Sequence, residues 1–293
     1  MIRKNELKSI TWAKIQRYRL IEWLLLWERK LNISTLMEVF SVSRVSASKD
    51  LNSYIKLHPE NVSDYQNREK YYKPTSKFKP YYTSEDPDEY YFTSKHILQI
   101  DKDINNTTLS QVPIIKRHIL PGVVSAILHA IQENNAIEIK YCSASFPDGL
   151  TRVVHPHRII SASGRYHVRA YCEERKNYRD FNLSRILENI RYVKNSIRNE
   201  SDDNQWNKTI SLILGINARL SAEASKLIAK EFKIKNELKI ETNAALINYL
   251  LIDNNVPSNE AEEAAASPWQ YPLVIKNRAD VSEYLWDSKE QDK

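Results

Sequence analysis

The chain has 293 residues, of which 42% are hydrophobic, so it can bury a substantial core, and ordinary domain sizes predict two or three domains. No run of about 18 apolar residues occurs, and the N-terminal segment lacks the apolar middle of a signal peptide, so we expect a cytoplasmic protein that contacts no membrane. The two cysteines, Cys142 and Cys172, lack the spacing of a zinc site or disulfide framework and are expected to be reduced core thiols.

The basic charge is concentrated at the N-terminal end of the chain, within a net charge of +6. Residues 1–80 carry 16 Lys and Arg against 8 Asp and Glu, whereas residues 201–293 carry 11 against 15. This asymmetry predicts that the first 80 residues bind a polyanion. The alternative is a basic face that is only solvated.

Three helices are predicted in the first 60 residues. Residues 11–30 have apolar side chains at helical spacing, which predicts a buried first helix. A short second helix is expected over residues 32–40, capped near Ser34. After a three-residue turn, Ser43 is expected to cap a third helix over residues 44–57, which Pro59 ends.

The third helix is amphipathic. Ala47, Leu51 and either Tyr54 or Ile55 recur every three or four residues, so they face inward. Five polar residues are left on the outward face: Arg44, Ser46, Ser48, Lys49 and Asn52. Short side chains allow a helix to approach the DNA major groove closely, and Arg and Asn can bond base edges. The pattern therefore predicts a recognition helix.

A basic hairpin is predicted directly after the helices. Residues 61–78 fit two short strands with a turn near residues 66–69, and the segment carries Arg68, Lys70, Lys73 and Lys77. The predicted DNA-binding residues are thus Arg44, Ser46, Ser48, Lys49, Asn52, Arg68 and Lys70. The alternative is a small helical bundle whose polar face contacts only water.

Residues 81–120 are mixed in composition and are interpreted as a connector. A helix with Pro121 in its first turn follows, and then segments that alternate like an antiparallel sheet. In the strand at residues 164–172 the side chains that share one face are Arg165, His167, Arg169 and Tyr171, and those on the other are Tyr166, Val168, Ala170 and Cys172. One face is expected to pack and the other to carry charge.

The last part of the chain predicts a small α+β domain. Residues 209–216 and 237–242 look like strands, and residues 221–232 and 243–252 look like amphipathic helices. Residues 258–275 are interpreted as an exposed loop followed by one more strand. Trp269, Tyr271 and Trp286 are candidates for a dimer interface, with the protein core as the alternative.

Three stretches together resemble a known family: "VVHPHRII" at residues 153–160, "GRYHVRAYC" at 164–172 and "YRDFNLSRI" at 178–186. Over essentially its whole length the chain resembles the WYL-domain transcriptional regulators. Tyr166, His167 and Val168 stand where that family has its Trp, Tyr and Leu. The three stretches are most similar to the subgroup that represses phage-defence loci such as BREX and CBASS clusters, whose members commonly read Arg-Trp-His-Val-Arg there.

The resemblance implies an α+β protein with a winged helix-turn-helix domain (residues 1–80), a connector (81–120), a WYL domain with an Sm-like or SH3-like small β-barrel (121–200) and a C-terminal α+β dimerisation domain (201–293). It implies a homodimeric repressor of a phage-defence operon that binds double-stranded operator DNA and senses a nucleotide or a single-stranded nucleic acid. The implied ligand residues are Tyr141, Ser143, Ser145, His167, Arg169, Arg179, Phe181 and Arg185. No catalytic residue, cofactor or metal is implied.

Elementary chemistry agrees with this ligand class, because guanidinium groups bind phosphates with paired bonds and aromatic rings stack on bases. In the alternative, the arginines pair with Glu173, Glu174, Asp180 or a partner subunit, and His167 is an ordinary strand residue. Two other functions stay open. An enzyme would use His155, His157 and Arg158, and a protein without a sensing role would bind RNA or single-stranded nucleic acid.

Overall fold

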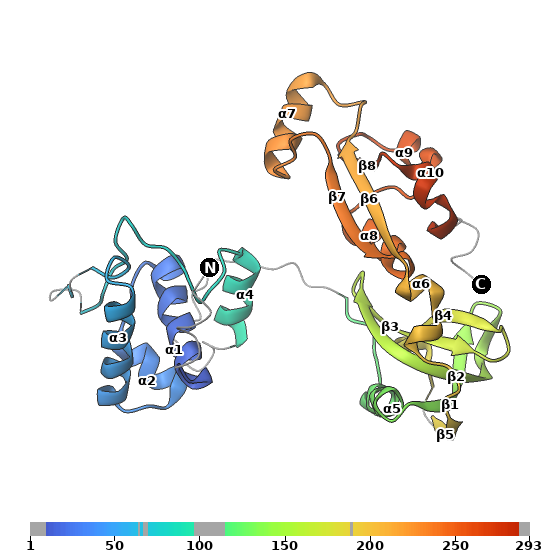
Figure 1. The fold of residues 1–293 in the computed structure, drawn as a ribbon, viewed down its shortest axis with the longest axis horizontal. Coiled ribbons are helices and arrows are strands. Elements are labelled where there is room, and N and C mark those ends of the chain that lie inside the picture. Colours follow the sequence, from blue (N-terminus) through green and yellow to red (C-terminus); the bar gives the residue numbers. More distant parts are fainter. Residues whose placement is uncertain (1–9, 64, 67–69, 97–114, 188–189, 287–293) are drawn as a thin grey trace. The chain divides into compact units, whose positions relative to one another are not determined.

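The computed structural model describes residues 10–63, 65–66, 70–96, 115–187 and 190–286 (Figure 1). The chain divides into two compact units, residues 1–113 and 114–293, which are described separately below. None of the helices in the described ranges is both long enough and apolar enough to cross a membrane.

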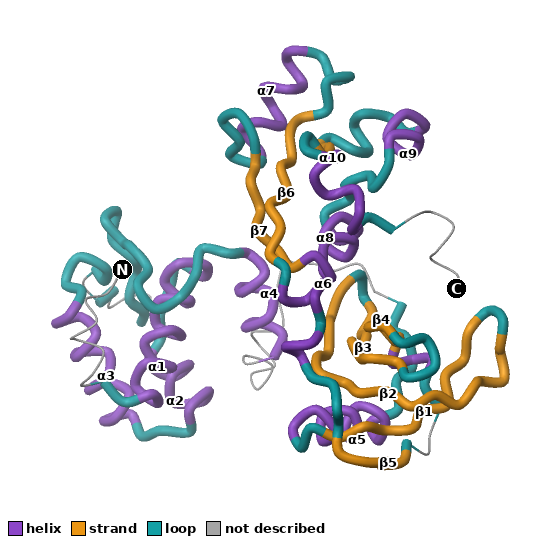
Figure 2. The backbone as a smooth tube through the Cα atoms, turned by 45° about the vertical axis from the view of Figure 1, so that its right-hand side comes forward, coloured by secondary structure: helices purple, strands orange, loops and turns teal. Residues whose placement is uncertain are grey.

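The first unit begins with helices, which Figure 2 draws in purple. The helix α1 (Trp12–Trp23) continues into a π-helical turn at Leu24–Glu28, and α2 (Ile33–Phe40) and α3 (Arg44–Leu57) follow. The bounds of α3 are those predicted from the sequence, and Ser43 caps it by accepting a hydrogen bond from the Ser46 backbone N–H at 3.2 Å. The cap of α2, expected near Ser34, is Asn32, which has the extended backbone of an N-cap and accepts from the Ser34 N–H at 3.1 Å.

The core of this unit lies between the three helices. Its buried residues include Tyr18, Ile21, Trp23, Leu25, Leu36, Ala47, Leu51 and Tyr54. The hairpin predicted after α3 is confirmed in its described residues, because Val62 pairs with Pro74 and Gln66 with Tyr71. Lys70 closes the turn with a left-handed backbone (φ 59°) and donates its N–H to the Gln66 carbonyl at 2.7 Å. Arg68 lies outside the described residues.

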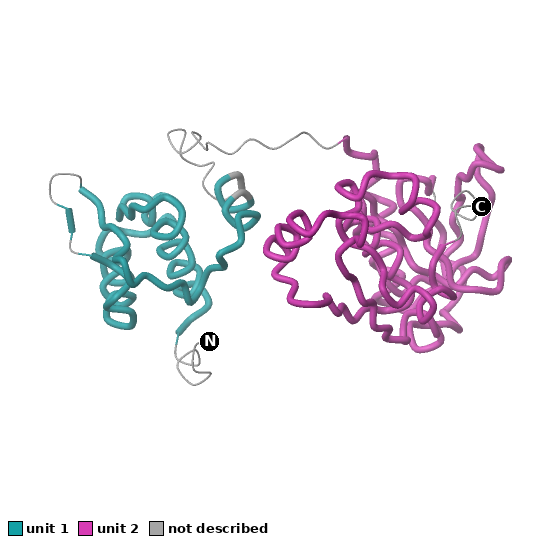
Figure 3. The backbone as a smooth tube through the Cα atoms, turned by 90° about the horizontal axis from the view of Figure 1, so that it is seen from above, with its two compact units in different colours: residues 1–113 teal, residues 114–293 magenta. Residues whose placement is uncertain are grey.

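Residues 81–96, which the sequence placed in a connector, pack on this same unit (Figure 3). The helix α4 (Pro87–His96) presents Tyr90, whose ring stacks on Trp23 with centroids 5.1 Å apart and planes 9° from parallel. The Tyr90 hydroxyl donates to Glu28 at 3.1 Å. Aromatic stacking and this bond attach α4 to α1.

A buried carboxylate holds the start of that segment. Glu22 of α1 is fully buried and accepts hydrogen bonds from the Tyr54 hydroxyl at 2.9 Å and from the backbone N–H groups of Tyr81, Tyr82 and Thr83 at 2.8, 2.5 and 3.2 Å. Asn61 donates to the Tyr54 hydroxyl at 2.8 Å. Burial raises the pKa of Glu22 above its ordinary value, although these bonds oppose the shift.

The second unit starts with α5 (Pro121–Gln132), which covers one face of a five-stranded antiparallel sheet in the order β4-β3-β2-β1-β5. The strands are β1 (Asn135–Ser143), β2 (Phe146–Ala162), β3 (Arg165–Cys172), β4 (Asn177–Asn182) and β5 (Arg191–Asn195). Tyr141 of β1 also makes a single bridge to Ile186, beyond the end of β4. The strand order found in the described residues is that of an open sheet, so the predicted barrel closure is not confirmed.

The end of the chain forms a second sheet, with the order β7-β6-β8. Its strands β6 (Thr209–Ile216), β7 (Leu238–Asn243) and β8 (Leu273–Ile275) agree with the prediction, as do α7 (Ala222–Glu231) and α8 (Ile247–Asp253). Two short helices, α6 (Asn204–Asn207) and α10 (Arg278–Val281), flank the sheet in sequence. The predicted loop contains a further helix, α9 (Glu260–Ala265), because Asn259 caps its acidic first turn.

Candidate nucleic-acid interface and ligand site

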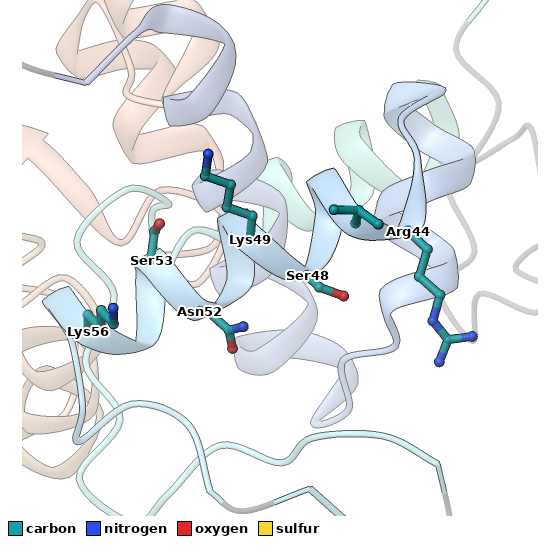
Figure 4. Close-up of a pocket in the computed structure, with 7 residues that line it drawn as sticks. Arg44, Ser48, Lys49, Asn52, Ser53 and Lys56 are labelled. Atoms are coloured by element: carbon teal, nitrogen blue, oxygen red, sulfur yellow. The ribbon is translucent and has the colours of Figure 1, made fainter.

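The outward surface of α3 forms an open pocket (Figure 4). We call it the α3 face, and the residues that line it are Arg44, Val45, Ser48, Lys49, Asn52, Ser53 and Lys56. These residues follow the spacing of three and four that places side chains on one side of a helix. Three of the seven are cations, so the face is suited to a polyanion.

Four of the five predicted residues of α3 line this face. Arg44, Lys49 and Asn52 are exposed, and Ser48 is half-buried. Ser46 is half-buried outside the pocket, where its backbone N–H completes the cap of α3. The sequence interpretation missed three members, Val45, Ser53 and Lys56. Continuing the helical spacing from Asn52 would have found Ser53 and Lys56.

The opposite side of α3 is fixed to α1. Asp50, buried on α3, accepts a hydrogen bond from Arg17 Nε at 2.5 Å, with the two side chains 10% and 17% exposed. Tyr54, one turn further on, donates to Glu22. Because a buried ion pair and a buried hydrogen bond both require a defined geometry, the α3 face is presented by a rigid helix.

The second candidate site, on the polar side of β3, is covered rather than open. Arg169 is only 3% exposed: its Nε donates to Asp203 Oδ2 at 2.6 Å, and its two terminal nitrogens donate to Asp203 Oδ1 (3.0 Å), Asp180 Oδ1 (3.2 Å) and Gln205 Oε1 (3.1 Å). The contact with Asp180 is one of the pairings expected in the alternative in which the arginines bind acidic residues rather than a ligand. The cover comes from residues 199–207, about 30 residues further along the chain.

Asp203 is the centre of this buried cluster. It is 1% exposed and also lies 3.0 Å from Nε2 of His157, and its carboxylate accepts the backbone N–H of Trp206 at 3.2 Å to cap α6. Burial alone would raise the pKa of Asp203, but His157 and Arg169 outweigh it and hold the pKa well below its ordinary value. The carboxylate is therefore ionised at neutral pH.

His167 lies beside this cluster and is 8% exposed. Its ring centroid is 5.2 Å from that of Tyr249 on α8, and its Nδ1 has no hydrogen-bond partner among the described residues. Burial lowers the pKa of His167; Asp180 opposes this shift, and Arg165, Arg185 and Arg117 add to it. This ring nitrogen is therefore a buried polar atom whose partner the described residues do not supply.

The other predicted ligand residues are distributed over the same sheet. Phe181 is 4% exposed in the core, where its ring meets Tyr141 edge to face at 5.1 Å. Ser143 and Arg179 are half-buried, and Ser145 and Arg185 are exposed. Because Phe181 packs inside the core while His167 and Arg169 lie on the covered face, the structure does not gather all eight on one surface.

The two histidines of the enzyme alternative have structural partners. His155 is fully buried between Ser196 Oγ at 2.7 Å and Glu173 Oε1 at 2.9 Å, and His157 contacts Asp203. Arg158 pairs with Glu200. Within the described ranges, no group of three or more His, Cys, Asp or Glu side chains could hold a metal ion.

Family models match most of the chain. Residues 14–94 match the winged helix-turn-helix domain of the BrxR transcriptional regulator, residues 122–191 the WYL domain, and residues 209–281 the BrxR C-terminal dimerization domain. The first match extends into α4 as far as residue 94, which agrees with the packing of residues 81–96 on the first unit.

Characterised relatives are similar over nearly their whole length. The chain is 30% identical to the DNA-binding transcriptional repressor CapW of Pseudomonas aeruginosa, covering 94% of this chain and 92% of the relative. It is 32% identical to CapW of Escherichia coli strain KTE188 (92% and 91% covered) and 24% identical to CapW of Stenotrophomonas maltophilia (96% and 95%).

Among solved structures, the PafBC protein of Arthrobacter aurescens aligns with a TM-score of 0.26 and 12% identity, over 93% of this chain and 47% of that one. The domain matches and the CapW relatives are sufficient: the chain belongs to the family of WYL-domain transcriptional regulators that includes BrxR and CapW.

Proposed function

We propose that this protein is a DNA-binding transcriptional repressor that binds double-stranded operator DNA as a homodimer. The observation that carries the proposal is the α3 face, on which Arg44, Lys49 and Asn52 are exposed on the second helix of a helix-turn-helix. In that motif the second helix enters the major groove and its N-terminal residues contact base edges. The CapW relatives, described as DNA-binding transcriptional repressors, support the same function.

The hairpin supplies the second DNA contact. Lys70 and Lys77 are exposed on the segment that follows α3, and both cations can neutralise backbone phosphates. A two-fold symmetric dimer is expected because one helix-turn-helix reads only a short DNA site. A dimer reads two half-sites and so recognises a longer, more specific sequence. The match of residues 209–281 to a dimerization domain supports pairing through the C-terminal part.

The effector belongs on the β3 side of the WYL domain, and its class is a nucleotide or single-stranded nucleic acid. Arg165 and Arg185, both exposed, provide donors that a phosphate group would accept from, and His167, whose Nδ1 is buried without a partner among the described residues, lies on the same strand as Arg165. Binding there changes operator affinity only as far as the effector prefers one arrangement of the dimer. The BrxR and CapW relationship supports a phage-defence operon as the regulated locus.

A mobility-shift titration tests the DNA function. Wild-type protein is titrated against duplex DNA from upstream of its own gene, and compared with the double variant Arg44→Ala, Lys49→Ala. The matched control is Lys140→Ala, Arg175→Ala, which removes the same charge from two exposed positions outside both the first unit and residues 209–281. We expect a specific shift that rising salt weakens, that the α3 variant loses by at least about tenfold, and that the control retains.

Two results would contradict this function. One is an α3 double variant that binds the duplex as tightly as the control. The other is a preference for single-stranded DNA or RNA competitors that survives deletion of residues 1–96, which would instead support the interaction protein without a sensing role. Competition with an unrelated duplex on the same complexes separates these results from non-specific charge attraction, since phosphate contacts alone show no preference for sequence.

A further inference from the structure

Val45 is the one apolar side chain among the seven that line the α3 face. It is the second residue of α3 and is 79% exposed, and it belongs to none of the buried clusters of the first unit. Ala47, Leu51 and Tyr54 supply the core contacts of this helix instead. Packing within the described residues therefore does not explain a valine at this position.

The position of Val45 on α3 and the residues around it indicate a role in binding instead. Ser48 and Lys49 follow Val45 by three and four residues, so the three side chains lie next to one another at the N-terminal end of the α3 face. A single exposed apolar residue is ordinary on a protein surface. This one is surrounded by cations, hydroxyls and an amide, on the part of a recognition helix that comes closest to base edges.

We propose that Val45 contacts the C5 methyl group of a thymine in the operator and so determines part of its sequence. The proposal rests on the DNA-binding function proposed above. Every other group on the major-groove edges of the four standard bases is a hydrogen-bond donor or acceptor, or a ring C–H, and the thymine methyl is the one apolar substituent. An isopropyl side chain, which has no polar atom, gains most free energy there by covering that methyl group, which offers more apolar area than a ring C–H.

The size of the effect follows from the area covered. Burial of one methyl-sized group changes an equilibrium constant by about fourfold. Arg44 and Asn52 on the same face have the donors and acceptors that suit guanine and adenine edges. Val45 is therefore expected to add discrimination at one base pair of each half-site without contributing to phosphate binding.

Substitution of thymine by uracil tests the contact, because it removes only the methyl group. The operator is first located by footprinting the bound upstream duplex, and each dT of one half-site and its symmetry mate is then replaced by dU. For wild-type protein we expect one position at which dU raises Kd by about fourfold for each half-site. Val45→Ala should raise Kd on the dT operator by a similar factor and bind the dT and dU operators equally.

Lys49→Ala is the comparison variant. It should weaken binding to both operators and preserve the ratio of the two Kd values, because a lysine contact with a phosphate does not involve the methyl group. Val45→Ala should fold normally, since the side chain is exposed and alanine is the better helix former. Thermal denaturation of the full chain checks this.

The outcomes separate the two proposals. If wild-type protein binds no duplex, both are wrong. If it binds the operator but no dU substitution weakens binding, or if Val45→Ala still distinguishes dT from dU, the Val45 contact is wrong while the DNA-binding function stands.

Discussion

Asp203 is predicted to be one of the most sensitive positions of the second unit. Truncation by Asp203→Ala removes two hydrogen bonds from the Arg169 guanidinium, the partner of His157 Nε2 and the cap of α6. Arg169 remains buried, with only Asp180 and Gln205 as partners. Removing one member of a buried ion pair costs about 3–5 kcal/mol, and the surviving Asp180 contact places the expected loss near 3 kcal/mol.

The measurement is urea unfolding of the full chain at fixed protein concentration, followed by tryptophan fluorescence. Glu241→Ala is the matched control, because its partner Lys239 and Glu241 itself are 62% and 64% exposed, and such pairs contribute about 0–1 kcal/mol. Asp203→Asn should fall between the two, since asparagine also caps helices but carries no charge. A loss for Asp203→Ala no larger than that of the control would refute the description of Asp203 as the centre of the cluster.

The difference in stability between wild type and Asp203→Asn should depend on pH in a defined direction. The pKa of Asp203 is held below its ordinary value of 3.8 in the folded state, so the carboxylate contributes stability that is fully present above pH 3.8. The advantage of wild type over Asp203→Asn should shrink as the pH falls below that value. An advantage that stays constant down to acid unfolding would contradict the assignment.

Two further predictions concern the first unit. Because burial raises the pKa of Glu22 above 4.5, the folded state holds that proton more tightly than the unfolded chain does. Wild type should therefore lose stability relative to Glu22→Gln as the pH rises from 4.5. Unfolding free energies over a pH series measure this, and a difference between the two proteins that stays constant or moves in favour of wild type would count against it. At the start of α2, Asn32→Ala should cost about 1 kcal/mol and Ser34→Ala close to nothing in a thermal or urea unfolding comparison, and the opposite order would restore Ser34 as the cap.

Local signals in the sequence were sufficient to predict α3. The polar turn before Ser43, the spacing of Ala47, Leu51 and Tyr54, and Pro59 predicted the bounds of α3 and the side on which its cations lie. These features depend on residues within one or two helical turns of one another, so residues close together in the sequence are sufficient to predict them. The family resemblance, which rested on short motifs in the strands, was confirmed by the domain matches.

Contacts between distant segments could not be predicted in the same way. Strand alternation correctly placed His167 and Arg169 on the side of β3 opposite to Val168 and Ala170, but it could not show that residues 199–207 cover that side. Similarly, the mixed composition of residues 81–120 suggested a connector, whereas Tyr90 attaches α4 to α1. In each case the deciding partner lies tens of residues away.

Glu22 links α3 to the segment that follows the hairpin. One carboxylate accepts from Tyr54 on the helix that carries the α3 face and from three consecutive backbone N–H groups at residues 81–83, where the chain leaves the hairpin. Residues 81–83, at the start of the segment that carries α4, are therefore fixed through Glu22 to the helix that presents the α3 face. A displacement of these three residues must either move that helix with them or break these buried bonds, so the position of residues 81–83 and that of the α3 face are coupled.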